Sequence, residues 1–164
     1  MNLPASNPVE QGLSLNETDV KKMVADLTTH NFTGFISATV EGFDGLEESL
    51  LLFKQGFLVA VSFNYLKQDL KFLGQDAFKR VFNSLASNQG IIDVFSLTLQ
   101  QLDLVMAFNE KSKLSKSVSR KDLNSFYTSN YQVEPVKVDL KQSGLRVQSK
   151  YDLLKKRGLS GITS

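Results

Sequence analysis

Few side chains in this sequence belong to the types that bind metals or act as nucleophiles. His30 is the single histidine, and the chain contains no cysteine. Because a zinc site needs three or four nitrogen, sulfur or oxygen ligands, one histidine without cysteine supplies too few of them. His30 follows an amphipathic segment, and the dipole at the carboxyl end of a helix favours a histidine there. We therefore expect a structural role for His30 and no metal site.

Neighbouring carboxylates are the other candidates for chemistry. Glu47 and Glu48 are adjacent in a segment with the character of a strand. Neighbouring residues of a strand point to opposite faces, so these two carboxylates cannot act jointly as acid and base. The sequence also lacks the glycine-rich phosphate-binding motifs and the nucleophile elbow of hydrolases. We expect no catalytic residue and no cofactor, and an enzyme ranks third among the hypotheses.

Basic side chains are concentrated in the last third of the chain. Residues 1–110 carry a net charge of −6 and residues 111–164 one of +8, which together give the +2 of the whole chain. Such a segment attracts phosphates or an acidic partner, or it folds as a strap on the acidic part of the same chain. Tyr127 and Tyr131 lie between its two basic groups, where they could stack on bases. The two groups are Lys111, Lys113, Lys116, Arg120 and Lys121, and then Lys150, Lys155, Lys156 and Arg157.

Length and composition favour one cytoplasmic domain. The chain of 164 residues has room for one domain with an appendage, and its twelve Phe without any Trp indicate a core of rings without polar atoms. No run approaches the roughly 18–20 apolar residues of a membrane helix, and the first residues lack the pattern of a signal peptide. We expect a cytoplasmic protein without stable membrane insertion.

Three segments have the apolar periodicity of helices. At the start of the first, Asn16 is the expected N-cap. At the start of the third, Thr98 and Gln101 form the pattern of a capping box, in which each side chain bonds to the backbone of the other residue. The expected helices cover residues 17–30, 74–88 and 99–110.

Further segments are rich in β-branched and aromatic residues, which favour strands. A three-residue loop at Lys54–Gly56 closes the hairpin between the second and third of them, and residues 66–73 form either a loop or a short helical turn. We expect an α+β fold: a four- to five-stranded, mainly antiparallel sheet with about three helices packed on it, followed by a basic, partly irregular C-terminal tail. The expected strands cover residues 33–40, 46–53, 57–63 and 90–95, with Leu13 and Leu15 in a candidate edge strand.

Composition also sets the expected boundaries. After Glu110 the sequence changes abruptly to Lys, Arg and Ser with few apolar residues, as is typical of a linker. Residues 1–15 are therefore predicted as an extended lead-in, residues 16–110 as the α+β domain and residues 111–164 as a basic tail or strap.

The central hairpin is apolar on both faces. Leu50–Phe53 and Phe57–Val61 are unbroken apolar runs, whereas a hairpin with one solvated face alternates apolar and polar residues. Helices can cover one face, so the second face must meet the tail, a second copy or another protein. Association ranks first, and cover by the tail ranks second. The tail residues expected to supply that cover are Leu114, Leu123, Phe126 and Leu140. The side chains expected to bind a partner are Leu51, Phe53, Phe57, Val59 and Val61.

The order of the expected elements is accompanied by several short motifs. They are Thr33-Gly34, Leu51-Leu52-Phe53, Gly56, Ala60 and the helix with Ala77 and Leu85. This order and these motifs resemble the PATAN domain, the amino-terminal domain of PatA-type response regulators. The segment from Gly90 to Asn109 is more similar to an uncharacterised archaeal family of standalone proteins. The resemblance implies an interaction module of signalling proteins, without catalytic residues to transfer.

The function expected from the sequence is a non-enzymatic adaptor or regulatory module. It would bind another protein, or a second copy of itself as a homodimer, through an apolar sheet or helix surface. The alternative is a nucleic-acid or anionic-ligand binding protein that uses the basic tail.

Overall fold

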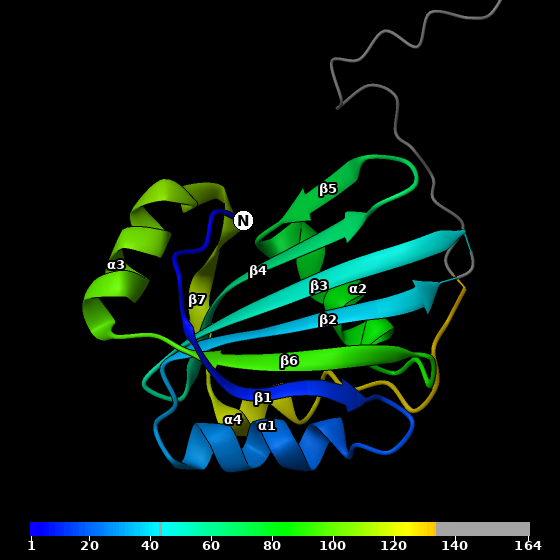
Figure 1. The fold of residues 1–164 in the computed structure, drawn as a ribbon, viewed down its shortest axis with the longest axis horizontal. Coiled ribbons are helices and arrows are strands. Elements are labelled where there is room, and N and C mark those ends of the chain that lie inside the picture. Colours follow the sequence, from blue (N-terminus) through cyan, green and yellow to red (C-terminus); the bar gives the residue numbers. More distant parts are fainter. Residues whose placement is uncertain (43, 134–164) are drawn as a thin grey trace, which may run out of the picture. The chain divides into compact units, whose positions relative to one another are not determined.

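Across residues 1–42 and 44–133, which the computed structural model describes, seven strands form one antiparallel sheet (Figure 1). The strand order is β1-β6-β2-β3-β4-β5. The outer edge of β4 is shared, because β5 pairs with its second half and β7 with its first half. The strands are β1 (Asn7–Ser14), β2 (Gly34–Gly42), β3 (Gly45–Lys54), β4 (Phe57–Tyr65), β5 (Leu70–Leu73), β6 (Gly90–Ser96) and β7 (Lys113–Val118).

Side chains cap the first turns of three helices, at Asp19, Thr98 and Ser119. The capping box predicted at Thr98 and Gln101 is confirmed, with both of its hydrogen bonds present. The N-cap of the first helix is Asp19 and not Asn16, since the Asp19 carboxylate accepts a hydrogen bond from the Lys22 backbone at 2.9 Å. The helices are α1 (Val20–Thr29), α2 (Gln75–Ser84), α3 (Leu99–Phe108), the 3-10 turn η1 (Glu110–Ser112) and α4 (Arg120–Leu123).

One face of the central hairpin is covered by α3. Leu50 and Leu52 of β3 and Ala60 of β4 form a buried cluster with Leu102 and Val105 of α3. Met1 and Leu3 of the first segment pack against the same cluster. Figure 1 shows α3 and the N-terminus together at one end of the sheet.

The opposite face is covered by α2. Leu51, Phe53 and Val61 point to this side and are fully buried. The Ser49 hydroxyl, on the same face of β3, bonds with the Ser84 hydroxyl of α2. In Figure 1 α2 accordingly lies behind the strands. The predicted burial of the hairpin on both faces is therefore confirmed. The expectation that helices cover only one face is wrong, because α2 and α3 lie on opposite faces of the sheet.

The sheet is larger than the four or five strands predicted. Residues 70–73 form β5 and residues 113–118 form β7, where the sequence indicates a loop or a linker. Both segments are short and lack strong apolar alternation, so their pairing depends on the open edge that β4 presents. The α+β class and the antiparallel pairing agree with the prediction.

The compact unit extends beyond residue 110, the boundary indicated by composition, and includes Met1–Val133. Its last part follows the α2 side of the sheet: Leu123 of α4 is buried, and the Tyr127 ring contacts Phe82 edge-on with centroids 5.2 Å apart. Leu123 and Phe126, two of the residues predicted for cover by the tail, take part in this packing together with Tyr127, since the Phe126 ring contacts Phe78 of α2.

The turn between β3 and β4 is tighter than predicted. Lys54 pairs with Phe57, so the loop contains two residues, Gln55 and Gly56, and not three. Both have positive φ, 50° and 81°, as the common two-residue hairpin turn requires. A Cβ atom at Gly56 would lie 2.5 Å from the Thr28 carbonyl oxygen, so α1 packs directly on this turn.

Two glycine substitutions distinguish the effect of backbone strain on stability from the effect of the steric contact between Gly56 and Thr28. Gly12 also has positive φ, 66°, but no atom lies within 4 Å of an added Cβ. Gly12→Ala is expected to lower the free energy of unfolding by about 1–2 kcal/mol through strain alone. Gly56→Ala is expected to lower it by about 3 kcal/mol, because the clash with Thr28 adds to the strain. Urea unfolding measures both values, and equal losses would contradict the packing of α1 on the turn.

Candidate functional site

Most of the side chains predicted to bind a partner lie inside the molecule. Leu51, Phe53 and Val61 are fully buried, and Val59 packs against the α3 cluster. Phe57, at the end of the hairpin, is 47% exposed. The sequence indicates two apolar faces but not their cover, which α2, α3 and the first residues supply. Among the five side chains predicted to bind a partner, Phe57 alone is exposed.

Two of the exposed large apolar side chains lie together on α3, whereas others are distributed over several elements. The inner side of α3, with Leu102 and Val105, belongs to the core, whereas Leu104 is 54% exposed and Phe108 71% exposed. Leu104 and Phe108 are four residues apart and therefore lie on the same side of the helix. Together with the exposed Ala107 they form what we call the α3 outer face. A helix that is apolar on all sides is typically buried.

An ion pair holds the hairpin against α3. Lys54 Nζ lies 2.6 Å from Asp103 Oδ1. Asp103 is the only charged residue in the α3 sequence. The one charge of α3 is therefore paired, and α3 brings no unpaired charge to its outer face.

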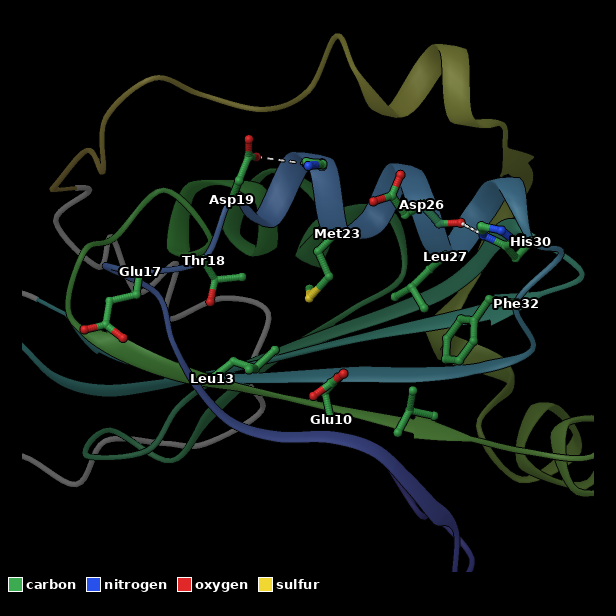
Figure 2. Close-up of a pocket in the computed structure, with 12 residues that line it drawn as sticks. Glu10, Leu13, Glu17, Thr18, Asp19, Met23, Asp26, Leu27, His30 and Phe32 are labelled. Carbon is green, nitrogen blue, oxygen red and sulfur yellow. Dashed lines mark hydrogen bonds between the residues drawn. The ribbon is translucent and has the colours of Figure 1, made fainter.

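A groove between β1 and α1 is the second exposed feature (Figure 2). It encloses about 720 Å³. Figure 2 shows Met23 and Leu27 pointing from α1 toward β1, with Glu10 pointing back from the strand. The lining of this β1–α1 groove consists of Val9, Glu10, Leu13, Glu17, Thr18, Asp19, Lys22, Met23, Asp26, Leu27, His30 and Phe32.

His30 lies at one end of the β1–α1 groove, as the C-cap of α1. Its Nδ1 is 2.7 Å from the Asp26 carbonyl oxygen, and its backbone N–H donates to the same oxygen. The ring is exposed, in an open groove with an apolar floor. Within residues 1–42 and 44–133, no group of three or more His, Asp or Glu side chains is arranged to hold a metal ion.

Glu47 and Glu48 point to opposite faces of β3, as predicted. Glu47 is buried on the α2 side, where its carboxylate accepts a hydrogen bond of 2.7 Å from the Tyr131 hydroxyl. Burial raises the pKa of Glu47, and the bond from Tyr131 opposes part of this rise. Glu48 accepts a hydrogen bond of 2.6 Å from the Asn64 amide on the other face. The two carboxylates therefore serve separate polar contacts.

The first basic group belongs to the folded unit. Lys111 lies in η1, Lys113 and Lys116 in β7, and Arg120 and Lys121 in α4; all five side chains are exposed. Lys113 approaches Glu110 at 4.0 Å, and Arg120 donates to the Thr29 hydroxyl. The second group, Lys150, Lys155, Lys156 and Arg157, lies outside the described residues.

Tyr127 and Tyr131, which could stack on bases, make contacts within the fold. Burial raises the pKa of the Tyr127 hydroxyl, with a smaller contribution from Asp19, and the Tyr127 ring contacts Phe82. Tyr131 bonds to Glu47. Stacking of Tyr127 on a base would require its ring to leave Phe82, whereas the contact of Tyr131 with Glu47 involves its hydroxyl.

Residues 1–109 match a family described as an uncharacterized protein conserved in archaea (DUF2226). Because this match covers more than half of the chain, the protein belongs to that family, and the resemblance to an uncharacterised archaeal family is confirmed. No curated protein and no solved structure is similar enough to count as a match. None of the helices in residues 1–42 and 44–133 has the length and apolar character needed to cross a membrane.

The buried Glu47 predicts a specific dependence of stability on pH. Because the pKa of Glu47 is raised above 4.5 in the folded state, the folded chain binds more protons than the unfolded chain just above that pH. This group's contribution to stability is therefore present at low pH and is lost as the pH rises through the folded pKa. Glu47→Gln is expected to flatten the decline in the free energy of unfolding as the pH rises above 4.5.

Urea unfolding across that pH range measures the effect. Glu41→Gln, at an exposed position of β2, is the matched control and should leave the pH profile unchanged. A Glu47→Gln profile that parallels the parent profile would show that burial does not raise the pKa of Glu47.

Proposed function

We propose that this member of the archaeal family is a non-enzymatic protein-interaction module whose contact surface is the α3 outer face. The observation that carries the proposal is the exposure of Leu104 and Phe108 on a helix whose other side is in the core. Contiguous apolar side chains in solvent are typical of interaction sites. The α3 outer face also replaces the sheet surface expected from the sequence, since most of that surface is buried.

Self-association is the form of interaction that the charges favour. Asp103 is paired with Lys54, so two α3 outer faces can meet without bringing unpaired charges of α3 together. Phe57, at the tip of the hairpin that Lys54 tethers to α3, adds a further exposed ring. A symmetric contact that uses the same patch twice is the commonest arrangement in homodimers.

The resemblance to PATAN domains is consistent with this proposal. Those domains act as interaction modules in signalling proteins, and an adaptor or regulatory role in the cytoplasm is the corresponding proposal for this chain. It requires no catalytic residue, no metal and no cofactor.

Charge on the α3 outer face should dissociate the dimer. We expect the parent chain to sediment as a dimer at micromolar concentration. Leu104→Glu combined with Phe108→Glu should give a monomer, because two carboxylates would then face each other across the contact. Analytical ultracentrifugation measures both species.

Leu66→Glu is the matched control, since Leu66 is 49% exposed in the β4–β5 connection and away from α3. It should remain dimeric. A parent chain that sediments as a monomer, or a dimer that survives both substitutions on α3, would contradict self-association through this face.

The second candidate function is binding of an anionic ligand or nucleic acid through the basic residues. Lys111, Lys116 and Lys121 are exposed and form no ion pair within residues 1–42 and 44–133. They extend over η1, β7 and α4, where a phosphate backbone could contact them. The remaining basic residues of this proposal, Lys150 and Lys155–Arg157, lie outside the described part of the chain.

Charge reversal in the full chain tests this candidate, because truncation at Glu110 would also remove β7 and Leu123 from the fold. Lys116→Glu with Lys121→Glu should weaken binding to a single-stranded oligonucleotide. It should also reduce the slope of log K against log salt by about 1.5, since two phosphate contacts are lost. Fluorescence anisotropy measures both quantities. Lys21→Glu with Lys79→Glu is the control, and equal effects of the two pairs would contradict a site on β7 and α4.

A further inference from the structure

We infer that the β1–α1 groove binds a basic amphipathic segment of a partner protein. This site is separate from the α3 outer face, because none of its lining residues comes from α3 or from the β3–β4 hairpin. The inference therefore does not depend on the proposed self-association. It rests on the apolar floor of the groove, on the carboxylates around it and on their spacing.

The floor of the groove consists of apolar side chains that are only partly buried. α1 buries Val20, Val24 and Thr28 against the rest of the chain. Its next apolar stripe, Met23 and Leu27, is half-buried and faces the groove (Figure 2). Leu13 of β1 and Phe32 beyond α1 are also half-buried parts of the lining.

Irregular pairing of β1 accounts for the space. β1 pairs with β6 with register shifts between Pro8 and Glu10 and between Glu10 and Leu13. Such bulges bend a strand and redirect its side chains. Gly12, with φ of 66°, lies within the second shift and donates its N–H to Asp93 at 2.8 Å. These contacts hold β1 in a bent course alongside α1.

Four carboxylates surround the floor, and they belong to Glu10, Glu17, Asp19 and Asp26. None of them forms an ion pair within residues 1–42 and 44–133. Lys22 is the only Lys or Arg in the lining, so the four carboxylates outnumber it by three. Charges of one sign beside an apolar surface attract a ligand of the opposite sign and fix its orientation.

The spacing of the carboxylates favours a protein segment over a small cation. Asp19 is the N-cap of α1 and Asp26 lies seven residues later, about 10 Å farther along the helix axis, and Glu10 lies across the groove on β1. Charges so far apart cannot converge on one ion. They match several Lys or Arg side chains on either side of an apolar stripe. An amphipathic helix that lays this stripe into a groove is a common mode of recognition.

A synthetic peptide of Leu and Lys at helical spacing tests the site in the full chain. A length of about 15 residues is near that at which an isolated helix becomes stable. We expect the peptide to bind, with weaker binding as salt rises, and to shift the NMR signals of the Met23 and Leu27 methyl groups. The same peptide with Glu in place of Lys should not bind.

Neutral substitutions at the rim identify the charges responsible. Glu10→Gln with Asp26→Asn should weaken binding of the Lys peptide about fivefold or more, since two exposed ion pairs are lost. Glu41→Gln is the matched control for an exposed carboxylate outside the groove, and Leu104→Glu with Phe108→Glu is the control for the α3 outer face. Both controls should bind as the parent does. Thermal unfolding verifies that each variant is folded.

Four outcomes would overturn the inference. They are equal binding of the Glu peptide, no loss of affinity in the rim variant, methyl shifts confined to other surfaces, and nuclear Overhauser contacts from the groove to another segment of the same chain. The last outcome would assign the groove to an internal ligand and not to a partner. Loss of binding in the Leu104 and Phe108 variant alone would place the peptide on the α3 outer face.

Discussion

The burial of the β3–β4 hairpin on both faces is the constraint on which the rest of the structure depends. Each fully buried Leu or Phe stabilises the fold by about 1.5–3 kcal/mol, so exposing either face would remove much of the stability of a domain of this size. Leu51, Phe53 and Val61 need one cover, and Leu50 and Leu52 need another. α2 and α3 therefore take opposite sides of the sheet, and the chain after α3 returns along the free edge of β4 as β7.

This arrangement determines where apolar surface is left for other molecules. The inner side of α3 is used to cover Leu50 and Leu52, and its remaining apolar residues, Leu104 and Phe108, face solvent. α1 has a similar division, since Val20 and Val24 are in the core and its other apolar stripe faces the β1–α1 groove. The two surfaces differ in charge. Asp103, the single charged residue of α3, is paired with Lys54, whereas the carboxylates around the groove form no ion pair within residues 1–42 and 44–133. The two surfaces therefore suit different partners.

Strong local signals in the sequence predicted the main elements. The helical stripes, the capping box of Thr98 and Gln101 and the apolar runs of the hairpin each act over a few residues, and each agrees with the structure. β5 and β7 could not be predicted from the sequence, because they pair with an edge of β4 that exists only in the assembled sheet. The helical period of residues 99–110 predicts that Leu102, Val105 and Met106 face the core, and the structure confirms this. The same pattern favours Phe108 on the inner side, which is wrong, because Phe108 is 71% exposed at the end of α3.

The sequence by itself determined that the central hairpin needs cover on two faces, that metal-binding and nucleophilic side chains are scarce, and that acidic and basic residues are separated along the chain. These properties follow from residue identity and local period, which do not change on folding. The tertiary structure decided which segments supply the cover, and hence which apolar and charged side chains remain outside. That choice depends on contacts between residues far apart in the chain, such as Lys54 with Asp103 and Glu47 with Tyr131, and local patterns do not encode such contacts.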